Sequence, residues 1–267
     1  MDLISIAALI VIGAIAGFLY GVLGAAGGVI LIPALLYFLQ GNSVTSLVSM
    51  HLTLGTSLLV VAVMSAIECR SYQKNGQIVW HAVGLLGVAG VVGSLLGTFG
   101  ATLLEGKTLQ RIFGVVLLLA TLRLVIDARK SKGEISGTKM QVGLLGGGFV
   151  VGALTPFASI GTGLFSFPLL YRLLRFPMKK ALGTSHATLG LTTLVSSMAF
   201  AFWGRGNSLL PEFSLGYVAY LHALLIALGA APLLIVGLSG AERWKLSVFR
   251  KGYALLLLIA ATRMLFL

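Results

Sequence analysis

The chain has little of what disulfide frameworks, metal centres and soluble enzymes require. It contains one cysteine, Cys69, and four dispersed histidines without the spacing of metal ligands. No Walker lysine motif is present, so ATP does not drive this chain directly. Only 10% of the residues are charged, against about 25% in soluble domains. We therefore expect no metal, no cofactor, no catalytic residues and no water-soluble domain.

Acidic residues are especially scarce, and we interpret all seven as lying at or near the ends of apolar segments. They are Asp2, Glu68, Glu105, Asp127, Glu134, Glu212 and Glu242. A cation carrier or a relay of carboxylates needs acids inside the membrane. Their apparent absence there argues against both classes.

Apolar residues dominate what remains. They make up 58% of the chain, and the mean hydropathy is +1.03. Because a membrane span needs about 20 apolar residues, we predict an all-α polytopic membrane protein. The net charge of +12 does not indicate nucleic acid, since the basic residues lie in short loops between spans. The expected segments are 3–39, 45–67, 79–104, 109–126, 141–171, 180–203, 214–240 and 246–267.

Unusual residues recur at one constant offset in the two halves of the chain. The recurring pairs are Gly13 and Gly148, Gly17 and Gly152, Gly28 and Gly163, Pro33 and Pro168, and the stretches His51–Gly55 and His186–Gly190. Helix breakers and polar groups are costly in apolar segments, so their repetition indicates a duplicated unit. We expect a first membrane repeat at 1–128, a basic cytoplasmic linker at 129–139 and a second membrane repeat at 140–267.

The first segment of each repeat is too long for one ordinary pass and is interrupted in its middle. Segment 3–39 contains glycines and Pro33, and segment 141–171 contains Pro156, glycines and Pro168. If both turn back as hairpins, the repeats have opposite orientations and most of the 19 basic residues face the cytoplasm. Single crossings would leave strongly basic loops outside. We therefore predict inverted repeats in the cytoplasmic (inner) membrane, with both termini outside.

Motifs in these segments resemble a known family. The first reads Gly21-x-x-Gly24-x-x-Gly27-Gly28-x-x-x-x-Pro33, and its counterpart reads Gly161-Thr162-Gly163-x-x-x-x-Pro168. Together with Asn75–Trp80 and Lys180–Ser185, they resemble the TauE/SafE sulfite-exporter-like permeases over essentially the whole chain. The chain departs from the family pattern at Ala26, where glycine is usual. The resemblance implies a permease for sulfite, sulfoacetate, thiosulfate or taurine-related sulfonates.

The interrupted segments are our candidate for the substrate site. A half-helix that begins after a glycine-rich break points free N–H groups and its positive dipole end into the membrane, where both favour an anion. The candidate residues are Gly24, Ala25, Gly27, Gly28, Ser159, Gly161, Thr162 and Gly163. The alternative is that these glycines serve only close helix packing, as we expect for Gly93 and Gly97.

His51 and His186 hold matching positions in segments 45–67 and 180–203. An ionisable residue inside a membrane segment is a functional candidate by default. A protonated imidazole attracts an anion or couples its movement to protons. The alternative is a histidine that only hydrogen-bonds a neighbouring carbonyl. Nearby hydroxyl residues are further candidates for binding substrate, namely Thr53, Thr184, Ser185 and Thr188.

Arg123 and Arg263 recur late in the last segment of each repeat. Two interpretations stay open for them: side chains that snorkel to the nearer interface, or cationic flanks that guide an anion.

Three classes of function remain. The first is a secondary transporter of a sulfur-containing anion that works by alternating access. The second is an anion channel with the same pocket. The third, an intramembrane enzyme or a membrane subunit of a complex, lacks a nucleophile–base set, so we expect no enzyme. The expected partners are the anion, the lipid bilayer and, as one option, a second copy in a homodimer, but no nucleic acid.

Overall fold

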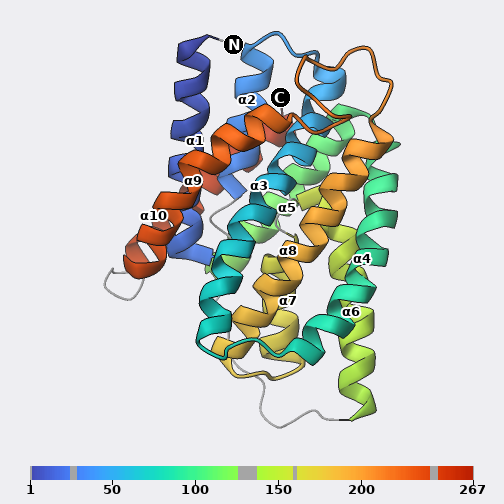
Figure 1. Cartoon of the computed structure of the whole chain (residues 1–267), viewed down its shortest axis with the longest axis vertical. Coiled ribbons are helices and arrows are strands. Elements are labelled where there is room, and N and C mark those ends of the chain that lie inside the picture. The colour runs from blue at the N-terminus through green and yellow to red at the C-terminus, as the bar shows by residue number, and fades with distance from the viewer. Residues whose placement is uncertain (1, 25–28, 126–136, 159–160, 241–245, 267) are drawn as a thin grey trace.

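The structure, a computed structural model, describes the backbone of residues 2–24, 29–125, 137–158, 161–240 and 246–266. Within these ranges the regular structure is helical, apart from an isolated bridge between Leu215 and Val218 (Figure 1). The predicted all-α class is confirmed. The helices are α1 (Leu3–Leu23), α2 (Leu31–Gly41), α3 (Ser46–Lys74), α4 (Trp80–Thr102), α5 (Gly106–Val125), α6 (Thr138–Ala158), α7 (Gly161–Pro168), the π-helical turn Leu169–Leu173, α8 (Met178–Trp203), α9 (Tyr220–Gly240) and α10 (Leu246–Phe266).

Glycines bring two pairs of helices into backbone contact. A Cβ added at Gly13 in α1 would overlap the carbonyl oxygen of Ile226 in α9. In α6, a Cβ at Gly148 would lie 2.6 Å from the carbonyl oxygen of Leu86 in α4. Gly13 and Gly148 are one of the recurring pairs, so the repeated glycine allows two helix backbones to approach closely in both halves of the chain. Close approach of backbones is the usual role of small residues in membrane helices.

The predicted contact at Gly93 and Gly97 is confirmed. A Cβ at either glycine would overlap backbone oxygens of α6, at Phe149 and Ala153. Along both contacts the residue numbers rise together, so α4 runs parallel to α6 and α1 runs parallel to α9.

Both interrupted segments turn back on themselves. We call the end of the molecule that holds both termini in Figure 1 the upper end, and the opposite end the lower end. α1 begins at the upper end. α2 returns to it, where the guanidinium carbon of Arg263 lies 4.5 Å from the Tyr37 ring centroid.

The second interrupted segment opens at the other end. α6 begins at the lower end (Figure 1), and a Cβ on Gly143, near that start, would meet the Leu174 side chain just beyond the π-helical turn. The α1–α2 hairpin therefore opens upward and the α6–α7 hairpin opens downward.

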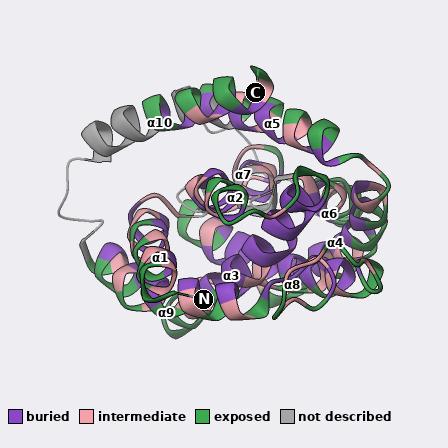
Figure 2. Ribbon diagram, turned by 90° about the horizontal axis from the view of Figure 1, so that it is seen from above, coloured by how far each residue is buried: buried purple, intermediate pink, exposed green. Residues whose placement is uncertain are grey.

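α3 and α8 form the antiparallel centre of the bundle. In α3, 83% of its most apolar stretch is buried, against 33–44% of the corresponding stretches in α1, α4, α6 and α9. Viewed from above, the buried residues concentrate on α3 and its neighbours (Figure 2). The Ser65 hydroxyl donates to the carbonyl of His186 at 2.6 Å, and the Ser197 hydroxyl donates to the carbonyl of Gly55 at 3.0 Å. Hydroxyl-to-carbonyl bonds therefore join the two central helices.

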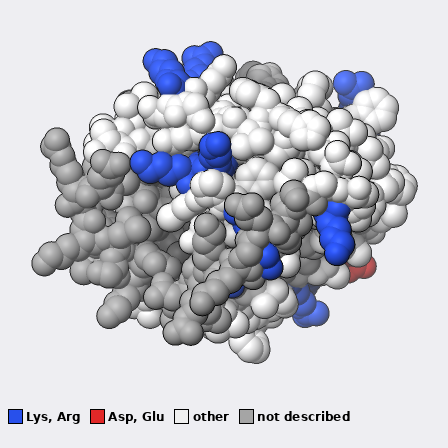
Figure 3. Space-filling view, turned by 90° about the horizontal axis from the view of Figure 1, so that it is seen from below, with Lys and Arg blue, Asp and Glu red and all other residues white. Residues whose placement is uncertain are grey.

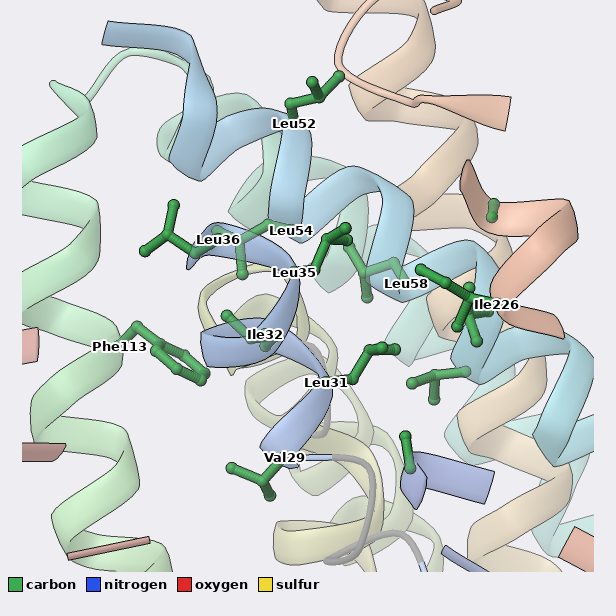
Figure 4. Close-up of a cluster of buried hydrophobic side chains, with 14 of the residues drawn as sticks. Val29, Leu31, Ile32, Leu35, Leu36, Leu52, Leu54, Leu58, Phe113 and Ile226 are labelled. Atoms are coloured by element: carbon green, nitrogen blue, oxygen red, sulfur yellow. The ribbon is translucent and has the colours of Figure 1, made fainter. Parts of the chain in front are cut away.

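The short helix α2 lies inside the bundle, where apolar residues of α3, α5 and α9 surround it (Figure 4). Leu35 lies toward Leu58 of α3, whereas Ile32 lies toward Phe113 of α5, and each of these four side chains is fully buried (Figure 4). Lipid is as apolar as leucine, so packing complementarity and not escape from water favours this contact. α2 thus begins at mid-height of the long helix α3.

Five of the described helices are long and apolar enough to cross a membrane: α1, α3, α4, α6 and α9. At 29 residues, α3 is about 43 Å long, which exceeds the roughly 30 Å hydrocarbon core. It extends seven residues beyond the expected segment 45–67, to Lys74. This difference carries Glu68 into the helix.

Lysine and arginine gather at the lower end, as the view from below indicates (Figure 3). The described basic residues there are Arg70, Lys74, Lys139, Arg172, Arg175, Lys179 and Lys180. The concentration matches the loops that the sequence assigned to the cytoplasm.

Candidate functional site

The interruption after α1 begins at Gly24, whose φ of 68° and ψ of −155° are essentially restricted to glycine. A Cβ at this position would lie 3.7 Å from Nε2 of His186. The end of α1 therefore meets a histidine of the central helix α8. Two of the predicted site residues, one from each repeat, are brought together here.

His186 pairs with Glu68 of α3. Nε2 of His186 lies 2.7 Å from Oε2 of Glu68, and the two side chains are 3% and 1% exposed. On the other side of the ring, Nδ1 lies 2.9 Å from the carbonyl oxygen of Leu182. The predicted alternative, a bond to a neighbouring carbonyl, is thus present together with a charge pair.

These two contacts set the smallest number of protons that the pair can hold. A carbonyl oxygen only accepts, so Nδ1 of His186 carries a proton. Two lone pairs 2.7 Å apart would repel, so at least one further proton is carried by the imidazole or by Glu68. With one further proton, the pair is either imidazolium with carboxylate or neutral imidazole with carboxylic acid. Its net charge is zero in both forms.

Glu68 corrects the expectation that every acid lies at or near a segment end. The polar stretch Glu68–Lys74 suggested a loop, but it forms the last two turns of α3, and Glu68 is fully buried. The argument against carboxylate relays therefore no longer holds. A sequence signal was available, because an acid next to an apolar span is a functional candidate when the helix continues through it.

Aromatic rings enclose the pair. Tyr72 of α3 stacks on the His186 ring at a centroid distance of 5.4 Å, and Tyr20 of α1 meets it edge-on at 6.3 Å. Both carboxylate oxygens of Glu68 and Nε2 of His186 are buried without a well-aligned hydrogen bond to the described residues, so proximity alone joins the pair. A buried charge with a free lone pair is costly, and such groups are retained where they have a function.

His51 lies in a different environment, near the upper end. Its side chain is buried and stacks on Tyr217 with centroids 4.9 Å apart. Trp203 occupies the position in the second repeat that corresponds to Glu68 in the first. The two histidines are therefore duplicated in sequence, but they differ in the partners that face them.

The candidate hydroxyls mostly bond to their own helices. Thr53, Ser185 and Thr188 donate to backbone carbonyls three or four residues earlier, at 2.7, 2.9 and 3.0 Å. Thr184 accepts a bond from the backbone N–H of Val79 at 3.1 Å and so links α8 to the start of α4. All four candidates are buried.

Several candidates fall outside what the structure describes. Ala25, Gly27, Gly28 and Ser159 lie outside the described residues. For Gly161, Thr162, Gly163 and Arg123 the helix is described but the side-chain environment is not. Arg263 is exposed, with its guanidinium over the Tyr37 ring. Of the breaks, the structure thus describes Gly24 and the first turn of α7.

Comparison with known proteins identifies the family. The sequence model described as "Sulfite exporter TauE/SafE" matches residues 9–264. The chain belongs to the TauE/SafE family.

Other TauE/SafE-like sequences support a role in membrane transport. A "Probable membrane transporter protein" of Haemophilus influenzae is 30% identical over 257 residues, covering 96% of both chains. A "Probable membrane transporter protein" of Bacillus subtilis is 25% identical, covering 74% of this chain and 79% of its own. No solved structure matches this chain. The chain is thus a multi-pass membrane transporter of the TauE/SafE family.

Proposed function

We propose that this transporter moves a sulfur-containing anion, such as sulfite, sulfoacetate or a related organosulfonate, across the cytoplasmic membrane by alternating access. The name of the matching family, sulfite exporter, supports the choice of cargo. Glycine-rich breaks that open a half-helix in the membrane suit an anion, because sulfonate and sulfite oxygens need donors and the backbone supplies them.

One observation carries the mechanism. The α1–α2 hairpin opens at the upper end and the α6–α7 hairpin opens at the lower end (Figure 1). We infer that the two halves are inverted repeats and that each hairpin belongs to the access route of its own side. In transporters built this way, the substrate site lies near the midplane between the repeats.

The charge distribution supports an orientation. Because positively charged loops are retained in the cytoplasm, the lower end with its lysines and arginines is cytoplasmic and both termini are outside (Figure 3). On this basis the α1–α2 hairpin faces outward and the α6–α7 hairpin faces the cytoplasm.

Counterflow in proteoliposomes tests the proposal. Vesicles of purified protein are loaded with unlabelled sulfoacetate or sulfite and diluted into the same anion carrying a ³⁵S label. A carrier draws label inward against equal or higher internal anion, and sulfate or chloride inside does not support the uptake. Label that enters without trans-stimulation indicates a channel. No uptake of either anion above protein-free vesicles refutes the proposed cargo.

A further inference from the structure

We propose that the Glu68–His186 pair is the proton site of this transporter, where one proton is taken up with each anion. The inference rests on the proposed transport function and adds its coupling ion. It draws on the position of the pair, its proton count, its surroundings and its absence from the matching position of the other repeat.

The pair lies where the two repeats and the first break meet. Glu68 comes from the first repeat and His186 from the second, and Gly24 at the end of α1 faces Nε2 of His186. A charge that changes here acts on an anion bound near Gly24 across low-dielectric protein. Coulomb interactions are far stronger there than in water.

The proton count supplies the coupling. With one shared proton the pair is neutral and gives an anion no net attraction. A second proton, taken from water on the open side, binds a carboxylate lone pair of Glu68 and leaves imidazolium beside carboxylic acid. The pair then carries one positive charge, which offsets one negative charge of the cargo. No bond of the protein breaks, and the proton returns to water on the opposite side when the anion leaves.

The titratable groups that face the pair come from two elements. Tyr20 reaches it from α1 and Tyr72 reaches it from α3, and both interact with Glu68. Tyrosine hydroxyls are neutral at physiological pH, so the proton has its place on Glu68 or His186. The thiol of Cys69 follows Glu68 directly in α3. The other described charged or titratable groups at this end lie near helix ends or at the π-helical turn, namely Arg70, Lys74, His81, Lys139, Tyr171, Arg172, Arg175, Lys179 and Lys180.

The asymmetry of the repeats argues for a function beyond packing. The duplicated scaffold keeps the histidine in both halves, as His51 and His186, but places a carboxylate beside only one. His51 stacks on Tyr217 instead, and Trp203 stands at the position that matches Glu68. One charge pair in a doubled fold predicts one proton per cycle.

A purely structural role makes a different prediction. A buried ion pair that only joins α3 to α8 affects stability when it is removed, but it leaves the driving force of transport unchanged. Exchange of labelled for unlabelled anion needs no net proton movement, whereas accumulation driven by a pH gradient does. The two assays therefore separate coupling from transport and from folding.

The experiment uses full-length protein in vesicles, with sulfoacetate and sulfite as probes and the membrane potential clamped at zero. An exterior one pH unit more acidic is expected to drive about tenfold accumulation in the wild type at one proton per anion. A pH dye inside the vesicles should report proton entry only when sulfoacetate is supplied. In Glu68→Gln, which keeps the size of the side chain, exchange is expected to persist while accumulation falls to about onefold.

Two further variants show whether a loss of accumulation is specific to the pair. Glu105→Gln removes an exposed acid outside the site and should accumulate sulfoacetate like the wild type. His186→Gln should lose accumulation like Glu68→Gln, with a monodisperse elution profile showing that both variants are folded.

The outcomes are distinct. Wild-type exchange without gradient-driven accumulation overturns the proton site and leaves the transporter standing. Accumulation by Glu68→Gln at the wild-type level also overturns the proton site and leaves the proposed transport function standing. Absence of wild-type exchange with both probes overturns the proposed cargo itself and, with it, this inference.

Discussion

Adding one methyl group to α6 tests the glycine contacts on which the fold depends. A Cβ at Gly148 would lie 2.6 Å from the carbonyl oxygen of Leu86, whereas ordinary van der Waals contact begins at 3.4 Å. In Gly148→Ala, α4 and α6 must therefore separate by roughly 0.8 Å, and overpacking of this kind costs about 1–3 kcal/mol. At Gly146 in the same helix a Cβ meets nothing within 4 Å, so Gly146→Ala is the matched control.

Thermal unfolding in detergent, followed by loss of monodisperse protein, measures the difference. Gly148→Ala is expected to melt several degrees below the wild type. Gly146→Ala should melt at the wild-type temperature or slightly above, since alanine favours the helix over glycine by about 1 kcal/mol. Gly13→Ala, at the matching position of the first repeat, should behave like Gly148→Ala because it meets Ile226 in the same way. Equal melting temperatures for Gly148→Ala and Gly146→Ala would refute the close α4–α6 contact.

Three further predictions concern orientation, the central helices and the first break. In a Cys69→Ser background without cysteine, Lys139→Cys should react with an impermeant maleimide only from the cytoplasm and Glu212→Cys only from outside; the reverse pattern refutes the orientation. Ser197→Ala removes a bond from α8 to α3 and should destabilise the protein by about 1 kcal/mol, and an unchanged melting curve contradicts that bond's contribution. Gly24→Ala forces alanine into a glycine-only conformation at about 1–3 kcal/mol. Its melting temperature should fall, and no fall contradicts the strained geometry.

The sequence predicted the framework well because its signals are local. The length of an apolar stretch predicts a membrane span, and glycine or proline within it predicts an interruption of the helix. The order of the segments therefore follows from the sequence alone. The hairpin form of the two first segments needed one further argument, the placement of basic loops. The duplicated glycines had two interpretations, and the structure assigns them differently. Gly13 and Gly148 serve helix packing, whereas Gly24 serves a special backbone conformation next to His186.

Local sequence signals did not predict that Glu68 is buried within a helix. Hydropathy weighs each residue alone, and the seven residues from Glu68 to Lys74 have the composition of a loop. What keeps the helix intact and the acid buried is a partner on another repeat, His186, together with the ring of Tyr72. Such long-range compensation leaves no periodic signal. His51 shows the converse, because a local sequence closely similar to that of His186 gave no hint that an aromatic ring from the loop before α9 would face it.

The backbone contacts of α1 with α9 and of α4 with α6 have a consequence for how this molecule can move. Each contact joins a helix of the first half of the chain to a helix of the second half. Neither half can therefore rotate as a rigid block without breaking both contacts. A motion that preserves both contacts must move α1 together with α9 and α4 together with α6. These packed pairs therefore do not follow the boundary between the two repeats that the sequence predicts.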